Sequence, residues 1–202
     1  MTKVEKSTFF DNDYVTINLV IILEVNMVGL DRDKVLLQPY NEDWAKEYEK
    51  EKNLLVSLLK GMNFRIEHVG STSIKGLSAK PIIDIAIGCD DEETVIKIGD
   101  ILSKYNYDVE NQMTTKGEIF AGKGDVTCRT HYIHIQKIGS TYWNNFMYFK
   151  TYLLDHPETV KEYEELKRGL SIKYQDDRKK YTASKNEFIS SILEKAHKIY
   201  KL

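Results

Sequence analysis

The chain has 202 residues, of which 42% are apolar and 30% are charged, and its formal net charge is −2. This length and apolar content suit one domain with a substantial core. The near balance of charges argues against a broad electrostatic contact with DNA or RNA. Two cysteines, Cys89 and Cys128, lie far apart and outside any CxxC pair. We expect both to be buried or half-buried thiols, which suits a reducing, cytoplasmic location.

Residues 1–30 are predicted to form an N-terminal extension. The apolar run at 17–23 ends at Glu24, so it is too short to span a bilayer, and its β-branched residues favour a strand. The acidic stretch before this run is unlike the positively charged start of a signal peptide. Met27 offers a second interpretation, in which the natural protein starts there and residues 1–26 lie upstream of it.

The predicted core domain, residues 31–140, starts with a helix and two strands. Asn41 is a residue type that caps helices, and Gly61 is placed to end one. Apolar residues at helical spacing from Trp44 to Leu59 predict the face that packs on the core. The elements expected in this half are a helix over 41–60, a strand over 64–69, a turn over 70–73 and an apolar strand over 82–87.

The second half of the core domain is predicted to hold one helix and three strands. Asp90 and Asp91 begin a helix that runs to about Tyr105. Residues 106–127 are expected to form two short strands. We expect turns at Lys116-Gly117 and around Gly122–Gly124. Residues 128–136 alternate between apolar and polar and predict a further strand.

The C-terminal part, residues 141–202, is predicted to be a subdomain of three helices. The first covers about 141–155, where the Tyr and Phe residues at helical spacing are expected to belong to the core rather than to a base-stacking surface. Pro157 suits the first turn of the second helix, and the capping box Ser184-Lys185-Asn186-Glu187 starts the third. The pattern as a whole predicts an α/β (α+β) fold with a C-terminal helical subdomain.

The turn Gly70-Ser71-Thr72-Ser73 ends a predicted strand. Backbone N–H groups and hydroxyls at such a turn are good ligands for phosphate oxygens, and Gly70 lets a ligand approach the backbone closely. The turn alone is a weak signal, because small residues also connect ordinary strands. His68, two residues before Gly70, is either a site residue or a core histidine with satisfied hydrogen bonds.

Asp84 places one carboxylate inside an otherwise apolar strand that follows Lys80-Pro81. A charge in such a place is costly unless it is paired, exposed or bound to a metal ion. Strand alternation puts Ile82 and Ala86 on the same face as Asp84. This carboxylate is therefore the first candidate for a catalytic or metal-binding residue.

The turn and the acidic strand together match a known pattern. Val69-Gly70-Ser71, the spacer 72–83 and Asp84-Ile85-Ala86-Ile87 have the spacing of the nucleotidyltransferase motif, and the stretch 68–88 resembles the GrpB family of that superfamily. The resemblance covers about residues 35–195. Its other segments are Arg129-Thr130-His131-Tyr132-Ile133-His134, Phe149-Lys150-Thr151-Tyr152-Leu153 with Pro157, Tyr163 to Lys167, and Tyr181, Lys185, Phe188 and Ile189.

The resemblance implies a nucleotidyltransferase-like mixed sheet and Mg²⁺- or Mn²⁺-dependent nucleotidyl transfer from a nucleoside triphosphate to an unknown acceptor. Enzymes of this superfamily use two Mg²⁺ ions held by two or three carboxylates. Here Asp84 supplies one carboxylate, and Ala86 or Ile82 stands where its partner acid would be. Glu67 and Glu118 are candidates for the missing ligand, and each also has an interpretation as a structural or surface carboxylate.

His134 is predicted to share a strand face with Tyr132, while His131 and Arg129 face the other way. If this strand lies beside that of Asp84, His134 could occupy the position of a third acid. An imidazole there could bind a metal ion or carry a proton at neutral pH. A core histidine with satisfied hydrogen bonds is the alternative for His134, and the motif also makes His131 a candidate site residue.

Basic residues are candidates for holding a phosphate ligand. Lys80, Arg129 and Lys185 are the main ones, with Lys75 as an addition. The family pattern implies that Tyr181 and Lys185 fold back over the cleft. Each of these cations, taken alone, also has an interpretation as a solvated surface residue.

The sequence leaves three functions open. One is a nucleotidyltransferase, and the second is a non-catalytic module that binds a nucleotide or a coenzyme A-related ligand. Proteins resembling this family occur fused to dephospho-coenzyme A kinase domains, which motivates the second. The sequence of this chain contains no Walker-type phosphate loop, Gly-x-x-x-x-Gly-Lys-Ser/Thr. The third function is a purely structural role or a role in binding another protein.

Overall fold

The computed structural model describes residues 28–31, 33–110, 117–125 and 127–200. The expected strand over 17–23 and the interpretation of Met27 as the start lie outside these residues. No helix in the described ranges is both long enough and apolar enough to cross a membrane. Cys89 is buried and Cys128 is half-buried, as expected.

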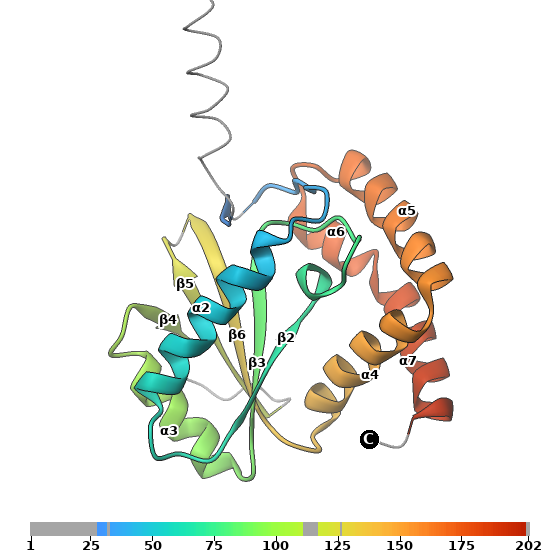
Figure 1. The fold of residues 1–202 in the computed structure, drawn as a ribbon. Coiled ribbons are helices and arrows are strands. Elements are labelled where there is room, and N and C mark those ends of the chain that lie inside the picture. The colour runs from blue at the N-terminus through green and yellow to red at the C-terminus, as the bar shows by residue number, and fades with distance from the viewer. Residues whose placement is uncertain (1–27, 32, 111–116, 126, 201–202) are drawn as a thin grey trace, which may run out of the picture.

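A six-stranded mixed sheet lies at the centre of the fold (Figure 1). Its order is β2-β3-β6-β5-β4, and the short β1 pairs with the start of β6. Strands β3 and β6 are parallel, whereas the other pairs are antiparallel. The strands are β1 (Leu30–Asp31), β2 (Arg65–Val69), β3 (Ile83–Cys89), β4 (Tyr107–Val109), β5 (Glu118–Gly124) and β6 (Cys128–Lys137).

Two helices, α2 (Asp43–Leu58) and α3 (Glu92–Leu102), cover one face of this sheet. The Asn41 side chain accepts a hydrogen bond from the Asp43 N–H at 2.9 Å, and Asp91 caps α3 by accepting from the Thr94 N–H at 2.7 Å. The buried faces of the helices pack on alternate residues of the central strands. The main members of this core are Trp44, Leu55, Val95, Ile98, Ile83, Ile85, Ile87, Ile133 and Ile135.

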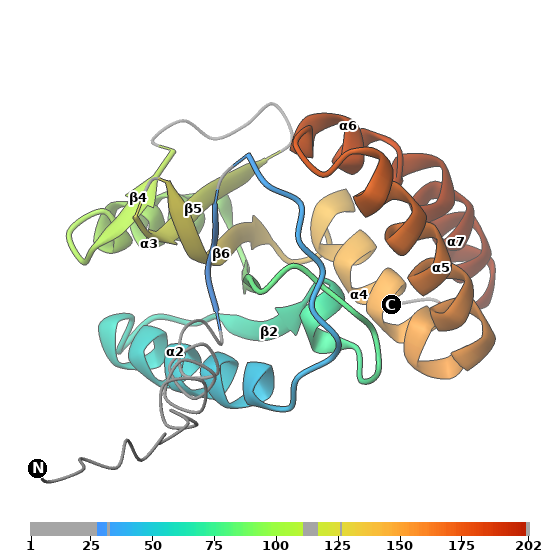
Figure 2. The same cartoon turned by 90° about the horizontal axis from the view of Figure 1, so that it is seen from above.

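Four helices follow the sheet and lie beside its other face (Figure 2). They are α4 (Thr141–Asp155), α5 (Pro157–Lys173), α6 (Arg178–Ala183) and α7 (Asn186–Ile199). The mixed α/β fold with C-terminal helices is thus confirmed, but the expectation of three helices was wrong. Asp177 caps the additional helix α6 by accepting from the Lys180 N–H at 3.0 Å. Ser184 has helical torsion angles at the end of α6, so it cannot act as the expected cap of α7.

The turn expected around Gly122–Gly124 lies just after these residues, because β5 continues through Gly122 to Gly124. A Cβ on Gly122 would lie 3.0 Å from Nε of Arg129, so the glycine makes room for that side chain on the neighbouring strand. The chain turns just afterwards. There the Asp125 carboxylate accepts from the Thr127 N–H at 2.8 Å.

Gly88 lies where α4 crosses β3, and alanine has no room there. A Cβ at this position would lie 2.6 Å from Cζ3 of Trp143 and 2.8 Å from Cγ1 of Ile138. We expect Gly88→Ala to lower the free energy of unfolding by about 1–3 kcal/mol, as overpacking does. Urea unfolding followed by tryptophan fluorescence measures this.

Gly169→Ala is the matched control for this prediction. Gly169 lies inside α5, and a Cβ there meets no described atom within 4 Å. We expect it to raise the free energy of unfolding by about 0.5–1 kcal/mol, because alanine is the better helix former. Equal stability of Gly88→Ala and the wild type would contradict the packing argument.

Candidate functional site

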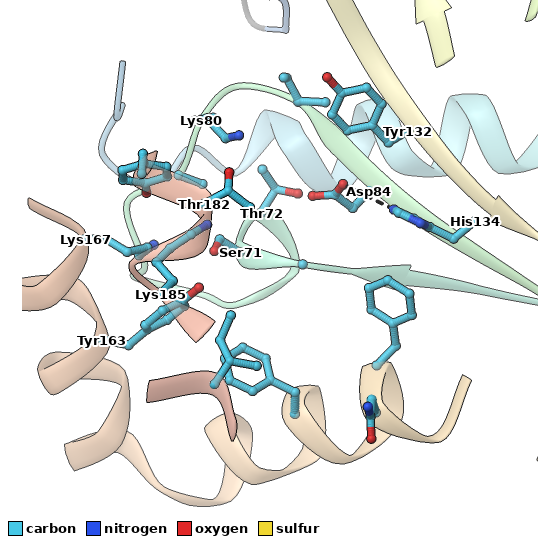
Figure 3. A pocket seen from close by; sticks show the side chains of 18 of the residues that line it. Ser71, Thr72, Lys80, Asp84, Tyr132, His134, Tyr163, Lys167, Thr182 and Lys185 are labelled. Carbon is cyan, nitrogen blue, oxygen red and sulfur yellow. Dashed lines mark ion pairs between the residues drawn. The ribbon is translucent and has the colours of Figure 1, made fainter. Parts of the chain in front are cut away.

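A cavity of about 430 Å³ lies between the sheet and the C-terminal helices (Figure 3). Most of the residues proposed from the sequence meet there, although they come from distant parts of the chain. Those that line the cavity are Gly70, Ser71, Thr72, Lys80, Asp84, His134, Tyr181 and Lys185.

The Gly70 turn forms one wall and touches Asp84 directly. Residues Ser71–Ser73 make one turn of 3₁₀ helix, and the Ser73 hydroxyl donates to the Gly70 carbonyl at 2.7 Å. Gly70 has φ +69°, and a Cβ on it would lie 2.5 Å from Oδ2 of Asp84. Glycine is therefore required both by the backbone conformation and by the carboxylate beside it.

His68 supports this turn from inside the protein rather than lining the cavity. Its Nε2 lies 3.0 Å from the Thr72 hydroxyl, and its ring stacks on Tyr48 with centroids 4.6 Å apart. Burial lowers the pKa of His68 to about 4, so the imidazole is neutral at physiological pH. This geometry makes His68 a positioning residue for the turn.

A chain of three ionisable groups runs from the cavity into the sheet. His134 Nε2 lies 3.7 Å from Oδ1 of Asp84, and its Nδ1 lies 2.7 Å from Oε1 of Glu118. Burial acts to lower the pKa of His134, but the two carboxylates outweigh it and raise the pKa to about 9. The imidazole is therefore charged at neutral pH, and a charged imidazole donates protons instead of coordinating a metal ion.

The charge on His134 can be measured directly. We expect its imidazole to titrate near pH 9 by NMR, and Glu118→Gln to lower that pKa because one of the two carboxylates is lost.

The pairing of His134 with the two carboxylates also makes the stability of the protein depend on pH. The pKa of His134 in the folded protein exceeds the ordinary value of about 6.5, so the pairing stabilises the protein fully below about pH 6.5 and loses its effect as pH rises through about 9. Glu187→Gln, on the surface of α7, is the control. Titration of His134 near pH 6.5 in the wild type would contradict the arrangement.

The two positions where a second acid was expected hold buried apolar residues. Ala86 pairs with His134 across the two strands and is fully buried with Val69 and Trp143 under α4. Ile82 is 2% exposed. In the described part of the chain, no group of three or more His, Cys, Asp or Glu side chains is placed to hold a metal ion. These donors do not match a centre of two metal ions.

Three lysines face the cavity opposite the turn and crowd around two tyrosine rings. Lys80 and Lys185 lie 5.8 and 4.5 Å from the ring centroid of Tyr181, and Lys167 lies 4.9 Å from that of Tyr163. Lys167 also donates to the Ser78 carbonyl. Within the described residues, none of the three has a carboxylate at ion-pair distance.

Burial lowers the pKa of each of these lysines, because the cavity solvates an ammonium group poorly. The pKa falls to about 7 for Lys80 and Lys167 and to about 8 for Lys185. Neighbouring cations add to the effect, among them Arg178, which donates to the Tyr132 hydroxyl at 2.7 Å at the edge of the cavity. The cavity thus gathers three basic groups whose charged forms are disfavoured by burial, and Asp84 in the same lining offsets this only in part for Lys80 and Lys185.

Other residues proposed from the sequence lie elsewhere. Arg129 forms an ion pair with Asp108 and lines a separate small cavity. Glu67 pairs with Lys150 at 3.1 Å, and Lys75 lies 3.9 Å from Glu42 at the surface. Buried His131 lies next to Thr130, at 3.0 Å from the hydroxyl, and Glu118 reaches the site through His134.

Several lining residues were not expected from the sequence. Lys167 follows Tyr163 by one helical turn, and this spacing placed it on the buried face of α5. Phe146 and Phe149 of α4, expected in the core, form part of the cavity wall. Arg178, which does not line the cavity but contacts Tyr132 at its edge, lies on α6, which the sequence pattern did not reveal as a helix. Only the Lys167 spacing was a usable signal.

Comparisons with known proteins agree on one family. The model of the family described as "GrpB protein" matches residues 34–195. The "Glutamate-rich protein GrpB" of Alkalihalophilus pseudofirmus is 35% identical over 171 residues, which is 83% of this chain and 98% of that protein. The "UPF0157 protein YqkA" of Bacillus subtilis is 32% identical over 163 residues, 81% of this chain but 47% of that longer protein.

A solved structure shows the same likeness in three dimensions. The crystal structure of the conserved protein GrpB from Enterococcus faecalis superposes with a TM-score of 0.73 at 30% identity, covering 81% of this chain and 98% of the other. The family model spans strands β2 to β6, helices α4 to α6 and most of α7, and these elements enclose the cavity. The chain belongs to the GrpB family.

Proposed function

We propose that the cavity binds a phosphorylated ligand, namely a nucleoside triphosphate or a related phosphate ester. The observation that carries the proposal is a set of three lysines, Lys167 buried and Lys80 and Lys185 half-buried, that face the cavity without a carboxylate at ion-pair distance among the described residues. A buried charge is costly until a counter-charge reaches it, and phosphate oxygens would supply that counter-charge. The Gly70 turn on the opposite wall offers backbone N–H groups and hydroxyls to the same anion.

One Mg²⁺ or Mn²⁺ ion fits this proposal as a companion of the triphosphate. Asp84 is partly exposed to the cavity and would hold the ion together with water and phosphate oxygens, which is the usual way Mg²⁺ is bound. The bound ion would neutralise phosphate charge. A second protein-held ion is not part of the proposal, because Ala86 and Ile82 give it no ligand.

Nucleotidyl transfer to an acceptor is the second candidate. The specific observation in its favour is the chain from Asp84 through His134 to Glu118, which holds a proton beside the place proposed for the phosphates. In this role His134 would orient Asp84, and its Nε2–H would serve as a proton donor beside the phosphates. Without transfer, the same cavity is a module that binds a nucleotide or a coenzyme A-related ligand.

Isothermal titration calorimetry with inorganic tripolyphosphate and with ATP tests the binding proposal. Loss of a buried cation that contacts an anion costs roughly 2–5 kcal/mol, so we expect Lys185→Gln to weaken binding by about 30-fold or more. Lys195→Gln is the control, because Lys195 is exposed on α7 and outside the cavity. Failure of the wild type to bind either ligand would overturn the proposal.

Label transfer separates the two candidates. The protein is incubated with α-labelled nucleoside triphosphates, Mg²⁺ or Mn²⁺, and a cell lysate as the source of acceptors. Asp84→Asn is compared with Asp100→Asn, which changes an exposed carboxylate of α3. Transfer that Asp84→Asn abolishes and Asp100→Asn retains supports the enzyme. Binding without transfer in all three proteins supports the binding module.

A further inference from the structure

The lining of the cavity has two chemically different parts. The lysine end consists of Lys80, Lys167 and Lys185, and Figure 3 shows these residues on one side of Asp84 and His134 on the other. The second part comes from α4 and α7. We call it the aromatic wall, and it consists of Tyr142, Phe146, Phe149, Ile189 and Leu193.

Ring contacts hold the aromatic wall in place and join it to the lysine end. The Phe146 ring lies 4.9 Å from that of His134, and Phe146 also packs against the Val69–Trp143 cluster. The Phe149 ring meets Tyr163 edge-on at 5.5 Å, and Lys167 lies over the other ring of that pair. The wall is therefore preorganised, and it is only half-buried because its remaining surface faces the cavity.

A ligand made only of phosphate would leave this wall in contact with water. Small-molecule sites of about 300–1,000 Å³ usually combine apolar walls with a few polar groups that fix orientation. The cavity of about 430 Å³ has this composition, with lysines for an anion and the aromatic wall for an apolar group. A ligand that fills it would carry an apolar part beside its phosphates.

We infer, building on the proposed function, that the ligand is a phosphate ester whose other end is a flat aromatic ring system seated on the aromatic wall. Ring faces of Phe and Tyr favour a stacked planar group. Asn145 lines the same end and brings an amide to the edge of such a ring, while its Oδ1 is steadied at 3.4 Å from Nε2 of His197. The site thereby selects nucleotides over inorganic polyphosphates, sugar phosphates and aliphatic phosphates.

Four probes that carry phosphate groups test the inference by calorimetry. They are inorganic tripolyphosphate, phosphoribosyl diphosphate, geranyl diphosphate and ATP. One stacked ring contributes roughly tenfold or more in affinity, so we expect ATP to bind at least about tenfold tighter than each of the other three. Phe146→Ala is expected to remove this advantage while tripolyphosphate affinity stays within about twofold of the wild type.

Two further variants keep the test decisive. Leu154→Ala alters an exposed apolar residue of the same helix, outside the cavity, and should leave all four affinities unchanged. Phe146→Leu retains apolar volume without a flat ring, so it should lose most of the ATP advantage even if Phe146→Ala fails to fold. Circular dichroism verifies the fold of each variant.

The outcomes separate this inference from the proposed function. Equal binding of ATP and tripolyphosphate by the wild type, or tightest binding of geranyl diphosphate, would overturn the inference and leave the phosphate site standing. A parallel loss of ATP and tripolyphosphate binding in a folded Phe146→Ala protein would also overturn it. Failure of all four probes would instead overturn the proposed function.

Discussion

Gly70→Ala is expected to weaken tripolyphosphate binding by about 30-fold or more and to lower the free energy of unfolding by about 1–3 kcal/mol. The new Cβ would lie 2.5 Å from Oδ2 and 3.0 Å from Cγ of Asp84, so either the turn or the carboxylate has to move. Both border the same cavity, and backbone N–H groups of the turn are proposed ligands of the phosphate. Calorimetry and urea unfolding measure the two effects.

Gly76→Ala is the control that separates the effect of backbone strain from the effect of the contact between a Cβ at position 70 and Asp84. Gly76 has φ +83°, close to the +69° of Gly70, but a Cβ there meets no described atom within 4 Å. We expect it to lower stability by a comparable strain of about 1 kcal/mol and to leave binding unchanged. Unchanged binding by Gly70→Ala would show that the turn does not contact the ligand.

The local pattern of the sequence was sufficient to bring the turn and Asp84 together. β2 and β3 are joined by the segment that begins with the Gly70 turn, and Val69 lies opposite Asp84 in their pairing. The two parts of the motif, which a short spacer separates in the sequence, are therefore in contact in the structure. The parallel pairing of β3 with β6 then placed His134 beside that carboxylate. The alternation of side chains along a strand and the assumption that β3 and β6 are neighbours were therefore sufficient to predict that His134 lies near Asp84.

The basic half of the site depended on information that the sequence pattern does not hold. Arg129 lies on the expected strand, but Gly122 on the next strand leaves its guanidinium room to turn towards Asp108. Arg178 reaches the edge of the cavity because a short helix, capped by Asp177, interrupts the tail. Which cation faces the cavity therefore depended on packing between segments far apart in the chain.

The structure also explains why residue 86, two positions after Asp84, is apolar. An acid at position 86 would lie under Trp143 and Phe146, where water cannot reach it. The helix α4 that covers this position also builds the aromatic wall. One packing arrangement therefore removes the second acid and creates the apolar end of the cavity.

The affinity for tripolyphosphate is expected to fall by about 100-fold or more between pH 7 and 9. In the free protein the pKa of Lys80 and Lys167 is about 7 and that of Lys185 is about 8, so all three are charged only below this window. A bound anion requires the charged form, and each proton that has to be taken up weakens binding by about tenfold per pH unit above the pKa. Tripolyphosphate loses its last proton within the same pH range, and this added negative charge opposes part of the fall without matching the loss of three lysine charges.

Calorimetry in two buffers of different ionisation heat measures this linkage as proton uptake. At pH 8 we expect the wild type and Lys195→Gln to take up about one proton or more on binding, and Lys185→Gln to take up fewer. The other groups facing these lysines do not reverse the sign. Arg178 lowers the pKa of Lys80 and Lys185, the pKa of Glu164 lies below its ordinary value, and His134 loses its charge only towards pH 9, which weakens anion binding further. An affinity that stays constant or rises from pH 7 to 9 would mean that the lysines are not in contact with the anion.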